Sequence, residues 1–572
     1  KTIRTPFVNN VIPQGRLDPV SLALREFWPS PNRLATNLAG AQNFAGNRSN
    51  KFTRDNITTR IDHVFSDSNR LFFRFVFNDD PYSWTSNYPG NIGDPQAPFS
   101  PKRWETSYYV NDSITVSPNL ITEIGYSFSN RTWVANSAGL GSGIVSKIGL
   151  PNVSNDAFPE IRVTGIASLG SGMDRTQNPI RQHQVTNSWT WIKGNHVLKF
   201  GGEVRKGINV DINRPITSGN FSFSPTGTGL PGNAATGIGY ASYLLGFVNG
   251  FSTRETELLD RYSYYLAGFA QDDWKISNDL TLNIGLRWET DTALMDKNDR
   301  SNSFDRYAIN PVSGTPGVVK FAGVDGWPEA PYGTDWNNFG PRFGFAWKPF
   351  GSQKSVIRGG YGIFFEGPST SANAASLGFE LSGATSSPDN GVTPAFYLRN
   401  GPDIAIGKAE LNDAFGAVPF GKRASTNVSF YEQNRRTGYA QHLNLGFQRE
   451  IAHNMIVEVR YTGNMSRKLP TGNMQINQVP IENAGPGNAQ VKRPYPQFNS
   501  VTVLSPTIGS NNYHSGTARI EKRYSGGLAF TAGYTWSRAI GDTVNTNGGL
   551  GEDQTWQDIY NRRLDKGPDA LD

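Results

Sequence analysis

Polar and apolar residues alternate along most of the chain, so the predicted strands have two different faces. In Leu280–Glu289 the even-numbered residues are apolar, and the odd-numbered ones are polar, charged or glycine. Val197–Lys206 and Leu120–Arg131 follow the same period of two, which is typical of strands that separate two environments. Helical periodicity is nearly absent, and its best example is Pro19–Trp28, which follows Asp18 as a candidate N-cap.

The alternating segments are long, at about ten to fourteen residues each. Strands of soluble proteins average about five to six residues, whereas a membrane-spanning strand needs about 9–11. No apolar run is long enough for a transmembrane helix. The lengths therefore favour strands with one face in lipid and the other lining a lumen.

The linkers between the expected strands alternate between short and long. Fourteen spanning strands are expected near 55–65, 70–79, 103–116, 119–132, 182–192, 196–208, 261–276, 280–291, 338–348, 355–366, 438–450, 455–465, 512–523 and 528–538. Short turns at one rim and long loops at the other are typical of outer-membrane barrels. The sequence therefore predicts an all-β fold, a transmembrane antiparallel up-and-down β-barrel with short periplasmic turns and long extracellular loops.

We expect residues 1–572 to form part of one such barrel domain. Residues 1–54 would be an outer loop with a short helix, 55–538 the strands and their loops, and 539–572 the start of a further outer loop. Phe247–Arg254 is assigned to a long excursion outside the membrane, with its own hairpin, because counting it as a spanning strand would put every later short turn on the wrong rim.

Composition narrows the class of protein further. Hydrophobic residues are 37% of the chain, below the roughly 45–50% of a soluble globule, while 12% aromatic residues argue against disorder. The absence of cysteine excludes disulfides and thiolate chemistry. A net charge of +6 without long blocks of like charge predicts no nucleic-acid partner.

Charged residues recur on the polar faces of the expected strands and are predicted to face the lumen. They are compatible with a hydrated channel wall or with a wall that hydrogen-bonds a plug, and in neither case with catalysis. These residues are Arg60, Asp62, Arg74, Glu123, Arg131, Glu203, Arg205, Arg287, Glu289, Glu458, Arg460, Arg519 and Glu521.

Aromatic residues fall into two groups. Those near strand ends are expected to form girdles at the lipid–water boundaries: Trp104, Tyr108, Trp189, Trp191, Tyr262, Trp274, Trp288, Trp347, Tyr461 and Trp536. Those in long loops could stack on a sugar or an aromatic ligand or could be packing anchors, with packing the better-supported role. The loop candidates for ligand contact are Trp84, Tyr88, Trp327, Tyr332, Trp336 and Tyr397.

No motif for catalysis, a cofactor or a metal stands out. The stretch GTGLPG at Gly227–Gly232 lacks the strand and helix of a dinucleotide site. None of the six histidines is spaced as a zinc pair, and no G-x-S-x-G elbow occurs. We therefore expect no enzyme, no cofactor and no metal.

Four segments resemble the TonB-dependent outer-membrane receptors, specifically the Oar-like β-barrel group. Phe269–Glu289 (FAQDDWKISNDLTLNIGLRWE) resembles that group's F-x-Q-D-x-W…L-T-L-N-x-G-x-R hairpin. Tyr439–Leu469 and Tyr513–Ile540 are similar to its Y-x-Q…G-x-Q-R-E…E-V-x-Y-x-G and Y-x-S…E-K-R…Y-T-W-S-x-A hairpins. Val8–Asn32 is similar to a loop with an N-x-I-P…R-x-D-P-V…P-x-P-N pattern.

The resemblance implies a place in the outer membrane of a Gram-negative bacterium and a barrel of about 22 strands with a plugged lumen. The chain would then be a fragment truncated at both ends, without the plug and the N-terminal regulatory-like domain. The implied partners are outer-membrane lipid and, through the absent N-terminal region, TonB with ExbB and ExbD.

The resemblance also implies a leading function and an alternative to it. The leading function is energised uptake of a large ligand of the siderophore, cobalamin, glycan or peptide class, driven by the inner-membrane proton gradient. The alternative is surface adhesion or protein export, as in Oar-type barrels, where the loops would bind a macromolecule.

Overall fold

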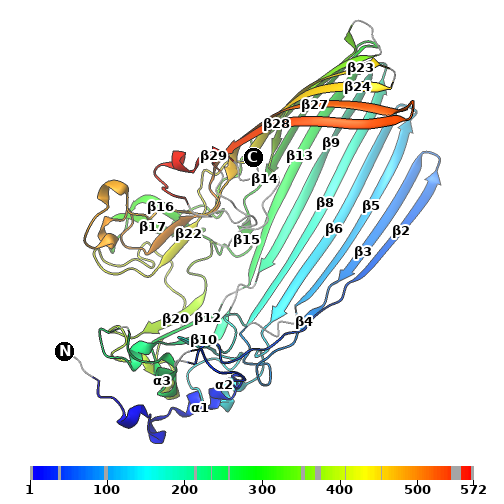
Figure 1. Ribbon diagram of the computed structural model, residues 1–572. Helices are drawn as coiled ribbons and strands as arrows, with labels where there is room; N and C mark the ends of the chain where they lie inside the picture. Colours follow the sequence, from blue (N-terminus) through cyan, green and yellow to red (C-terminus); the bar gives the residue numbers. More distant parts are fainter. Residues whose placement is uncertain are drawn as a thin grey trace.

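The computed structural model describes residues 4–36, 40–95, 101–211, 215–233, 235–255, 258–349, 354–366, 375–405, 407–452, 454–542 and 556–568. Within them, one sheet of 16 strands runs through the molecule (Figure 1). Two of its strands, β15 Met295–Asp296 and β29 Gly567–Pro568, have two residues each. The others are β2 Asp55–Ser66, β3 Asn69–Asp79, β5 Lys102–Ser117, β6 Leu120–Asn136, β8 Arg175–Lys193, β9 His196–Asp211, β13 Leu259–Lys275, β14 Leu280–Asp291, β18 Phe339–Trp347, β19 Ser355–Phe365, β23 Tyr439–Ala452, β24 Met455–Pro470, β27 Thr507–Ser525 and β28 Leu528–Gly541.

Each long strand pairs antiparallel with the next long strand along the chain. This meander confirms the predicted fold class, and each of the fourteen expected strands is present. Several strands are longer than predicted: β8 starts at Arg175, where 182 was expected, and β6 continues to Asn136. The sheet does not close among the described residues, since it ends in β2 on one side and in β28 and β29 on the other.

Short turns lie at one end of the sheet and long loops at the other, as predicted (Figure 1). The tight turns use residues that accept a left-handed backbone. Gly194, between β8 and β9, has φ +60°, and Gly526 and Gly527, between β27 and β28, have φ +62° and +78°. A Cβ is strained in this region, so glycine keeps these turns to two residues.

The long loops build two compact clusters beyond the strand ends. The first loop cluster holds the helices α1 Pro19–Arg25, α2 Ile144–Lys147 and α3 Gly239–Leu244. It also holds a four-stranded sheet in the order β20 Leu381–Ser386, β12 Gly250–Glu255, β10 Ile216–Phe223 and β7 Glu160–Val163. Its core joins residues far apart in the chain, among them Leu24, Ile161, Phe221, Tyr243 and Leu398.

The second loop cluster has its own sheets and core. Its hairpin is β16 Asn302–Ile309 with β17 Pro316–Phe321, and its second sheet runs β22 Asn427–Phe430, β26 Ser500–Val503, β25 Met474–Gln475. The core includes Phe304, Phe321, Phe430, Phe498 and Val501. In Figure 1 this cluster stands apart from the first one, above the same end of the barrel sheet.

The remaining elements are short. The strands β1 Asn50–Phe52 and β4 Tyr82–Trp84 pair with each other, as do β11 Phe247–Val248 and β21 Phe396–Tyr397. Single turns of 3-10 helix occur at η1 Val8–Asn10, η2 Gln14–Arg16, η3 Pro225–Gly227, η5 Leu398–Asn400, η6 Ile481–Asn483, η7 Ala489–Lys492 and η8 Arg562–Asp565. No helix in the described part of the chain is long and apolar enough to cross a membrane.

Two local predictions hold in the first loop cluster. The helix expected at Pro19–Trp28 forms over Pro19–Arg25, and the Asp18 side chain caps it by accepting from the backbone N–H groups of Val20 and Ser21. The segment 247–254 lies outside the spanning strands, and β12 pairs antiparallel with β10, from which residues 224–249 separate it.

Candidate functional site

The barrel sheet presents an exposed apolar face. Ile124, Val185, Val204, Ile284 and Leu286 are each between 47% and 50% exposed although they lie mid-strand. Such side chains on a long strand are matched to lipid rather than to water. Tryptophans of this face, among them Trp191, Trp274 and Trp347, lie at the short-turn ends of their strands. Tyr461 and Trp536 instead lie well inside β24 and β28, away from the ends where a girdle was expected.

The opposite face of the sheet, which we call the polar wall, carries the charged residues predicted to face the lumen. Many of these residues form ion pairs within one strand. Arg60 and Asp62 form an ion pair at 2.6 Å in β2, and Arg519 and Glu521 form one at 2.8 Å in β27. Arg205–Glu203, Arg287–Glu289 and Arg460–Glu458 repeat this arrangement in β9, β14 and β24. Residues i and i+2 of a strand share a face, which brings each pair together. Arg74, Glu123 and Arg131 have no ion-pair partner among the described residues.

One of these pairs extends into a network across three strands. Arg287 in β14 donates to Glu289 at 3.1 Å and to the hydroxyl of Tyr265 in β13 at 2.8 Å, and its Nη2 lies 3.8 Å from Glu203 in β9. Tyr265 in turn donates to Glu289 at 2.5 Å. The Arg205 guanidinium lies 4.7 Å from the centre of the Tyr265 ring. This network fixes a cation between two carboxylates on the polar wall.

The polar wall also contains several hollows, two of which have volumes of about 370 and 350 Å³. One, of about 370 Å³, is floored by Gly285, Gly344, Gly360 and Gly362, and Arg342, Phe364 and His442 stand at its sides. The Arg342 guanidinium lies 4.6 Å from the centre of the Phe364 ring. The second hollow, of about 350 Å³, is lined mainly by hydroxyl and amide groups, namely Ser107, Tyr109, Ser127, Ser129, Gln184 and Thr186, with Arg74. Both could receive polar groups that enter the lumen.

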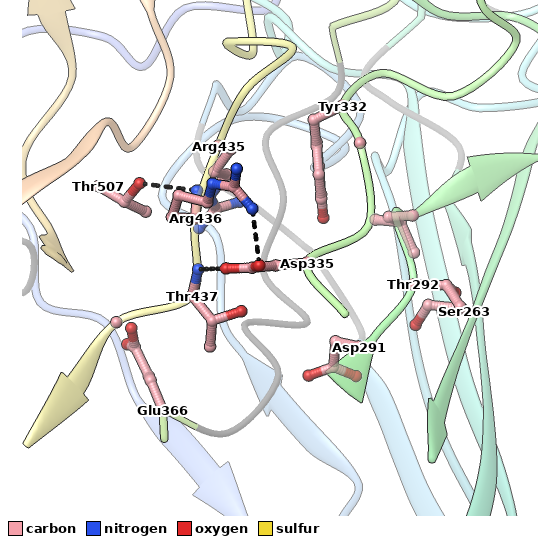
Figure 2. Close-up of a pocket in the computed structure, with 13 residues that line it drawn as sticks. Ser263, Asp291, Thr292, Tyr332, Asp335, Glu366, Arg435, Arg436, Thr437 and Thr507 are labelled. Carbon is pink, nitrogen blue, oxygen red and sulfur yellow. Dashed lines mark hydrogen bonds and ion pairs between the residues drawn. The ribbon is translucent and has the colours of Figure 1, made fainter. Parts of the chain in front are cut away.

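A smaller cavity of about 80 Å³ lies at the rim where β13 and β14 meet the loops (Figure 2). Ser263 and Asp291 continue the polar face of these strands to the cavity. Loop residues close it: Tyr332, Asp335, Glu366, Arg435, Arg436, Thr437 and Thr507. A volume of 80 Å³ holds only a few water molecules, so a large ligand would enter here only if the loops moved apart.

Asp335 fastens two loops to the strand ends at this cavity. Its carboxylate accepts from Arg436 Nη1 at 2.9 Å and from the backbone N–H of Thr437 at 3.0 Å (Figure 2). Its carbonyl oxygen accepts from the Thr290 hydroxyl in β14 at 2.8 Å. The backbone N–H of Arg436 donates to the Thr507 hydroxyl at 3.3 Å. The loops before β18 and β23 therefore meet at one carboxylate, and the first residue of β27 joins them through the Arg436 backbone.

Two tyrosines beside the cavity stay uncharged. The rings of Tyr332 and Tyr431 pack edge to face, with centroids 5.5 Å apart, and the Arg435 guanidinium lies 5.2 Å and 5.8 Å from them. Burial raises the pKa of Tyr431 to about 12 and also raises the pKa of Tyr332. Both hydroxyls therefore keep their protons at neutral pH, and Arg435 supplies a positive charge above neutral aromatic rings.

The loop aromatics proposed as ligand contacts occupy different environments. Tyr88 packs against the core of the first loop cluster, and Tyr332 packs against Tyr431. Trp327 is half-buried, and its ring N–H has no hydrogen-bond partner among the described residues. Trp336 is 53% exposed and stacks on Trp288, with ring centroids 6.3 Å apart. Tyr397 is 36% exposed and contacts Phe247, while the side chain of Trp84 lies outside the described part of the structure.

Sequence reasoning missed Tyr265, Asp335 and Arg342. Tyr265 shares the odd-numbered face of β13, so strand parity could have found it. Asp335 and Arg342 gave less signal, because their partners come from other loops and strands. The described residues contain no group of three or more His, Asp or Glu side chains that could hold a metal.

Comparison with known proteins gives a family and a fold. A family model described as "Outer membrane beta barrel domain" matches residues 1–572. Among solved structures, the outer membrane transporter YddB from Escherichia coli is similar with a TM-score of 0.50 and 12% identity, over 92% of this chain and 52% of that one. No curated protein matches the chain at a significant level.

Two further solved structures are similar at lower scores. The FrpB iron transporter from Neisseria meningitidis has a TM-score of 0.40 and 10% identity, over 89% of this chain and 55% of that one. The alcaligin outer membrane receptor FauA from Bordetella pertussis has a TM-score of 0.40 and 6% identity, over 85% and 53%. The chain thus spans about half the length of the solved structures that it resembles.

Proposed function

The chain belongs to the outer membrane beta barrel domain family, whose place is the Gram-negative outer membrane, and from this premise we propose that its sheet is part of the wall of an outer-membrane transporter. The polar wall would be the passage and the loop clusters the ligand-binding surface. The observation that carries this proposal is the contrast between the apolar face and the polar wall with its ion pairs and hollows.

The energy source and cargo are the finer part of the proposal. We infer uptake driven by the inner-membrane proton gradient through TonB, ExbB and ExbD. The motifs at Phe269–Glu289 and Tyr439–Leu469 support this by their resemblance to TonB-dependent receptors, and the fold it shares with YddB is compatible with it. The cargo would be a siderophore, cobalamin, glycan or peptide, because passive pores serve smaller solutes.

The polar wall supports transport in two ways. Ion pairs such as Arg287–Glu289 give the wall a hydrated surface with charges of both signs. Because these charges balance, the wall has no large net electrostatic field. The glycine-floored hollow beside Arg342 and the hydroxyl-lined hollow beside Arg74 offer places where a plug or a cargo could donate and accept hydrogen bonds.

A second candidate function is adhesion or export through the loops. The second loop cluster exposes large apolar side chains, with Tyr307 86%, Ile309 62% and Phe420 55% exposed. Exposed apolar groups on a water-facing module favour contact with another macromolecule.

Uptake assays on cells that lack the gene, with and without the restored full-length gene, separate the two functions. The probes are radio-iron-loaded siderophores, labelled cobalamin, and fluorescent oligosaccharides and peptides. The transporter proposal expects gene-dependent accumulation of one probe that a proton uncoupler or loss of TonB abolishes. Adhesion or export expects unchanged uptake of every probe and a gene-dependent change in surface attachment or secreted protein.

A further inference from the structure

A tyrosine, a histidine and a lysine come together on the apolar face, on three consecutive strands of the barrel sheet. The Tyr126 hydroxyl of β6 lies 3.0 Å from Nδ1 of His183 in β8. His183 pairs directly with Lys206 in β9 in the strand register. The Lys206 ammonium lies 5.7 Å and 5.5 Å from the ring centres of Tyr262 and Tyr264 in β13. We name Tyr126, His183 and Lys206 the first triad.

The same arrangement recurs at the other side of the sheet. The Tyr461 hydroxyl of β24 lies 2.8 Å from Nδ1 of His514 in β27, and His514 pairs directly with Arg538 in β28. The ring centroids of the two Tyr–His pairs are 6.4 Å and 6.2 Å apart. Tyr461, His514 and Arg538 form the second triad, with the tyrosine, histidine and cation in the same order on successive strands.

Both triads lie at the same depth along their strands. Tyr126 and Tyr461 each stand six residues after the first residue of their strand, which follows a short turn. Lys206 and Arg538 each stand ten residues after the first residue of theirs. A strand crosses the apolar layer in about 9–11 residues. The cations therefore stand where the apolar layer ends on the long-loop side, at the headgroups of the outer leaflet.

The charges around the triads leave these cations without carboxylate partners. Arg181 adds a third basic group beside His183, two residues nearer the rim, and no ion pair joins Arg181, Lys206 or Arg538 to a carboxylate of the described residues. Two acids near the long-loop ends of these strands have cations of their own, and Asp112 in β5 lies deeper on this face, opposite Ile124. Asp260 faces Lys297 at 3.9 Å and Asp542 binds Arg562 at 2.8 Å.

Each histidine can donate from Nε2 in the tautomer in which Nδ1 accepts from the tyrosine hydroxyl. A tyrosine hydroxyl that donates to Nδ1 leaves the imidazole proton on Nε2. That N–H has no partner among the described residues. Each triad thus presents one N–H donor beside one fixed cation, with aromatic rings below them in the apolar layer.

We propose that each triad binds the phosphate of a phosphorylated glycolipid headgroup in the outer leaflet of the outer membrane. The cation and the imidazole N–H would bind phosphate oxygens, and the aromatic and aliphatic side chains below would contact the acyl chains. The barrel would then carry two lipid sites on its outer surface, independent of any cargo in its lumen.

Native mass spectrometry tests the proposal. The full-length protein is extracted from its outer membrane, and purified lipopolysaccharide is added as the probe. The wild type should retain up to two lipopolysaccharide molecules. The variant His183→Phe/Lys206→Gln and the variant His514→Phe/Arg538→Gln should each lose one site. The four-fold variant should bind the probe about fivefold or more weakly, because each cation near a membrane surface contributes that much to binding of anionic lipid.

A matched control keeps the test specific. Lys193→Gln removes a lysine that lies 4.9 Å from the Trp191 ring on the same sheet, at the short-turn boundary, and should leave retention unchanged. Wild-type protein offered dephosphorylated lipopolysaccharide should lose most retention, which needs no variant to fold. Unchanged retention in the four-fold variant, equal loss in Lys193→Gln, equal binding of the dephosphorylated probe, or full competition by millimolar inorganic phosphate would each overturn the proposal.

Discussion

The buried carboxylate of Asp18 accepts a hydrogen bond from the backbone N–H of Arg399, 381 residues later in the chain, at 3.1 Å. The same side chain caps α1 through Val20 and Ser21. Asp18 is fully buried, and its own N–H donates to the carbonyl of Leu244. One residue therefore joins the segment before β2 to two later loops, through its carboxylate to Arg399 and through its backbone N–H to Leu244.

Replacing Asp18 by alanine should loosen the first loop cluster while the barrel stays folded. The change leaves three N–H groups without this acceptor, and those of Val20 and Ser21 are buried. Each buried unsatisfied group costs about 1–3 kcal/mol. Hydrogen exchange followed by mass spectrometry should show faster exchange in α1 and near Arg399 and unchanged exchange in β13 and β14. Asp403→Ala, at an exposed carboxylate of the same loop, is the control, and equal exchange in both variants would contradict the role of Asp18.

Arg287→Gln should destabilise the barrel through its polar wall. Glu203 and Glu289 would then share the wall without the cation that lies between them. These side chains are 15–20% exposed, so the loss should be about 1–3 kcal/mol of unfolding free energy. Urea unfolding of the full-length protein in detergent measures it. Arg74→Gln, which removes a wall cation without an ion pair among the described residues, should cost about 0.5 kcal/mol or less.

Asp174 should make the stability of the first loop cluster depend on pH. It is 2% exposed; Thr217 donates to one of its oxygens through N–H and hydroxyl, and the other oxygen has no partner among the described residues. Burial raises its pKa, against the lowering effect of the Thr217 bonds.

The sign of this dependence follows from linkage. The folded state holds the proton more tightly than the unfolded state, whose pKa is about 3.9. The protonated Asp174 side chain therefore contributes its full share to the free energy of unfolding below that value. This contribution is lost as pH rises through the folded-state pKa of Asp174. The midpoint of thermal unfolding of this cluster should fall over that rise, and Asp174→Asn should flatten the profile. Identical pH profiles for the wild type and Asp174→Asn would refute a role of Asp174 in the pH dependence.

Trp336 and Tyr88 should behave differently although both are loop aromatics. Tyr88→Ala removes a ring that packs against the core of the first loop cluster, which should cost about 1–3 kcal/mol and expose the loops to proteinase K on intact cells. Trp336→Ala removes an exposed ring that stacks on Trp288 and should cost about 1 kcal/mol or less. Similar protease sensitivity of both variants would contradict the role of Tyr88 as a packing anchor and of Trp336 as an exposed residue.

The barrel strands were predictable because their signals are local. Alternation in Leu280–Glu289 specifies the two faces, and short turns such as the one at Gly194 mark the strand ends. The loop clusters were not predictable, because their cores join Leu24, Tyr243 and Leu398 across hundreds of residues. Their strands are short, and β10 pairs in parallel with β7, so no turn connects the partners.

The polar wall was predictable only in part. Parity placed Arg287 and Glu289 on one face, and the repeated charge pairs at i and i+2 were a visible signal for their ion pairs. The link from Arg287 to Glu203 depends on the register between β9, β13 and β14. Asp335 and Arg436 meet through two loops, which no local pattern encodes.

The assignment of the two faces of the sheet is the central claim, and single cysteines in β14 test it most directly. The natural chain has no cysteine, so Asn283→Cys, Ile284→Cys, Gly285→Cys and Leu286→Cys can each carry one label in the full-length protein. A water-soluble maleimide should react with the cysteines at 283 and 285, and a fluorophore at 284 and 286 should be quenched by brominated lipid. Reactivity and quenching without this alternation would contradict a lipid-facing apolar face and a water-facing polar wall.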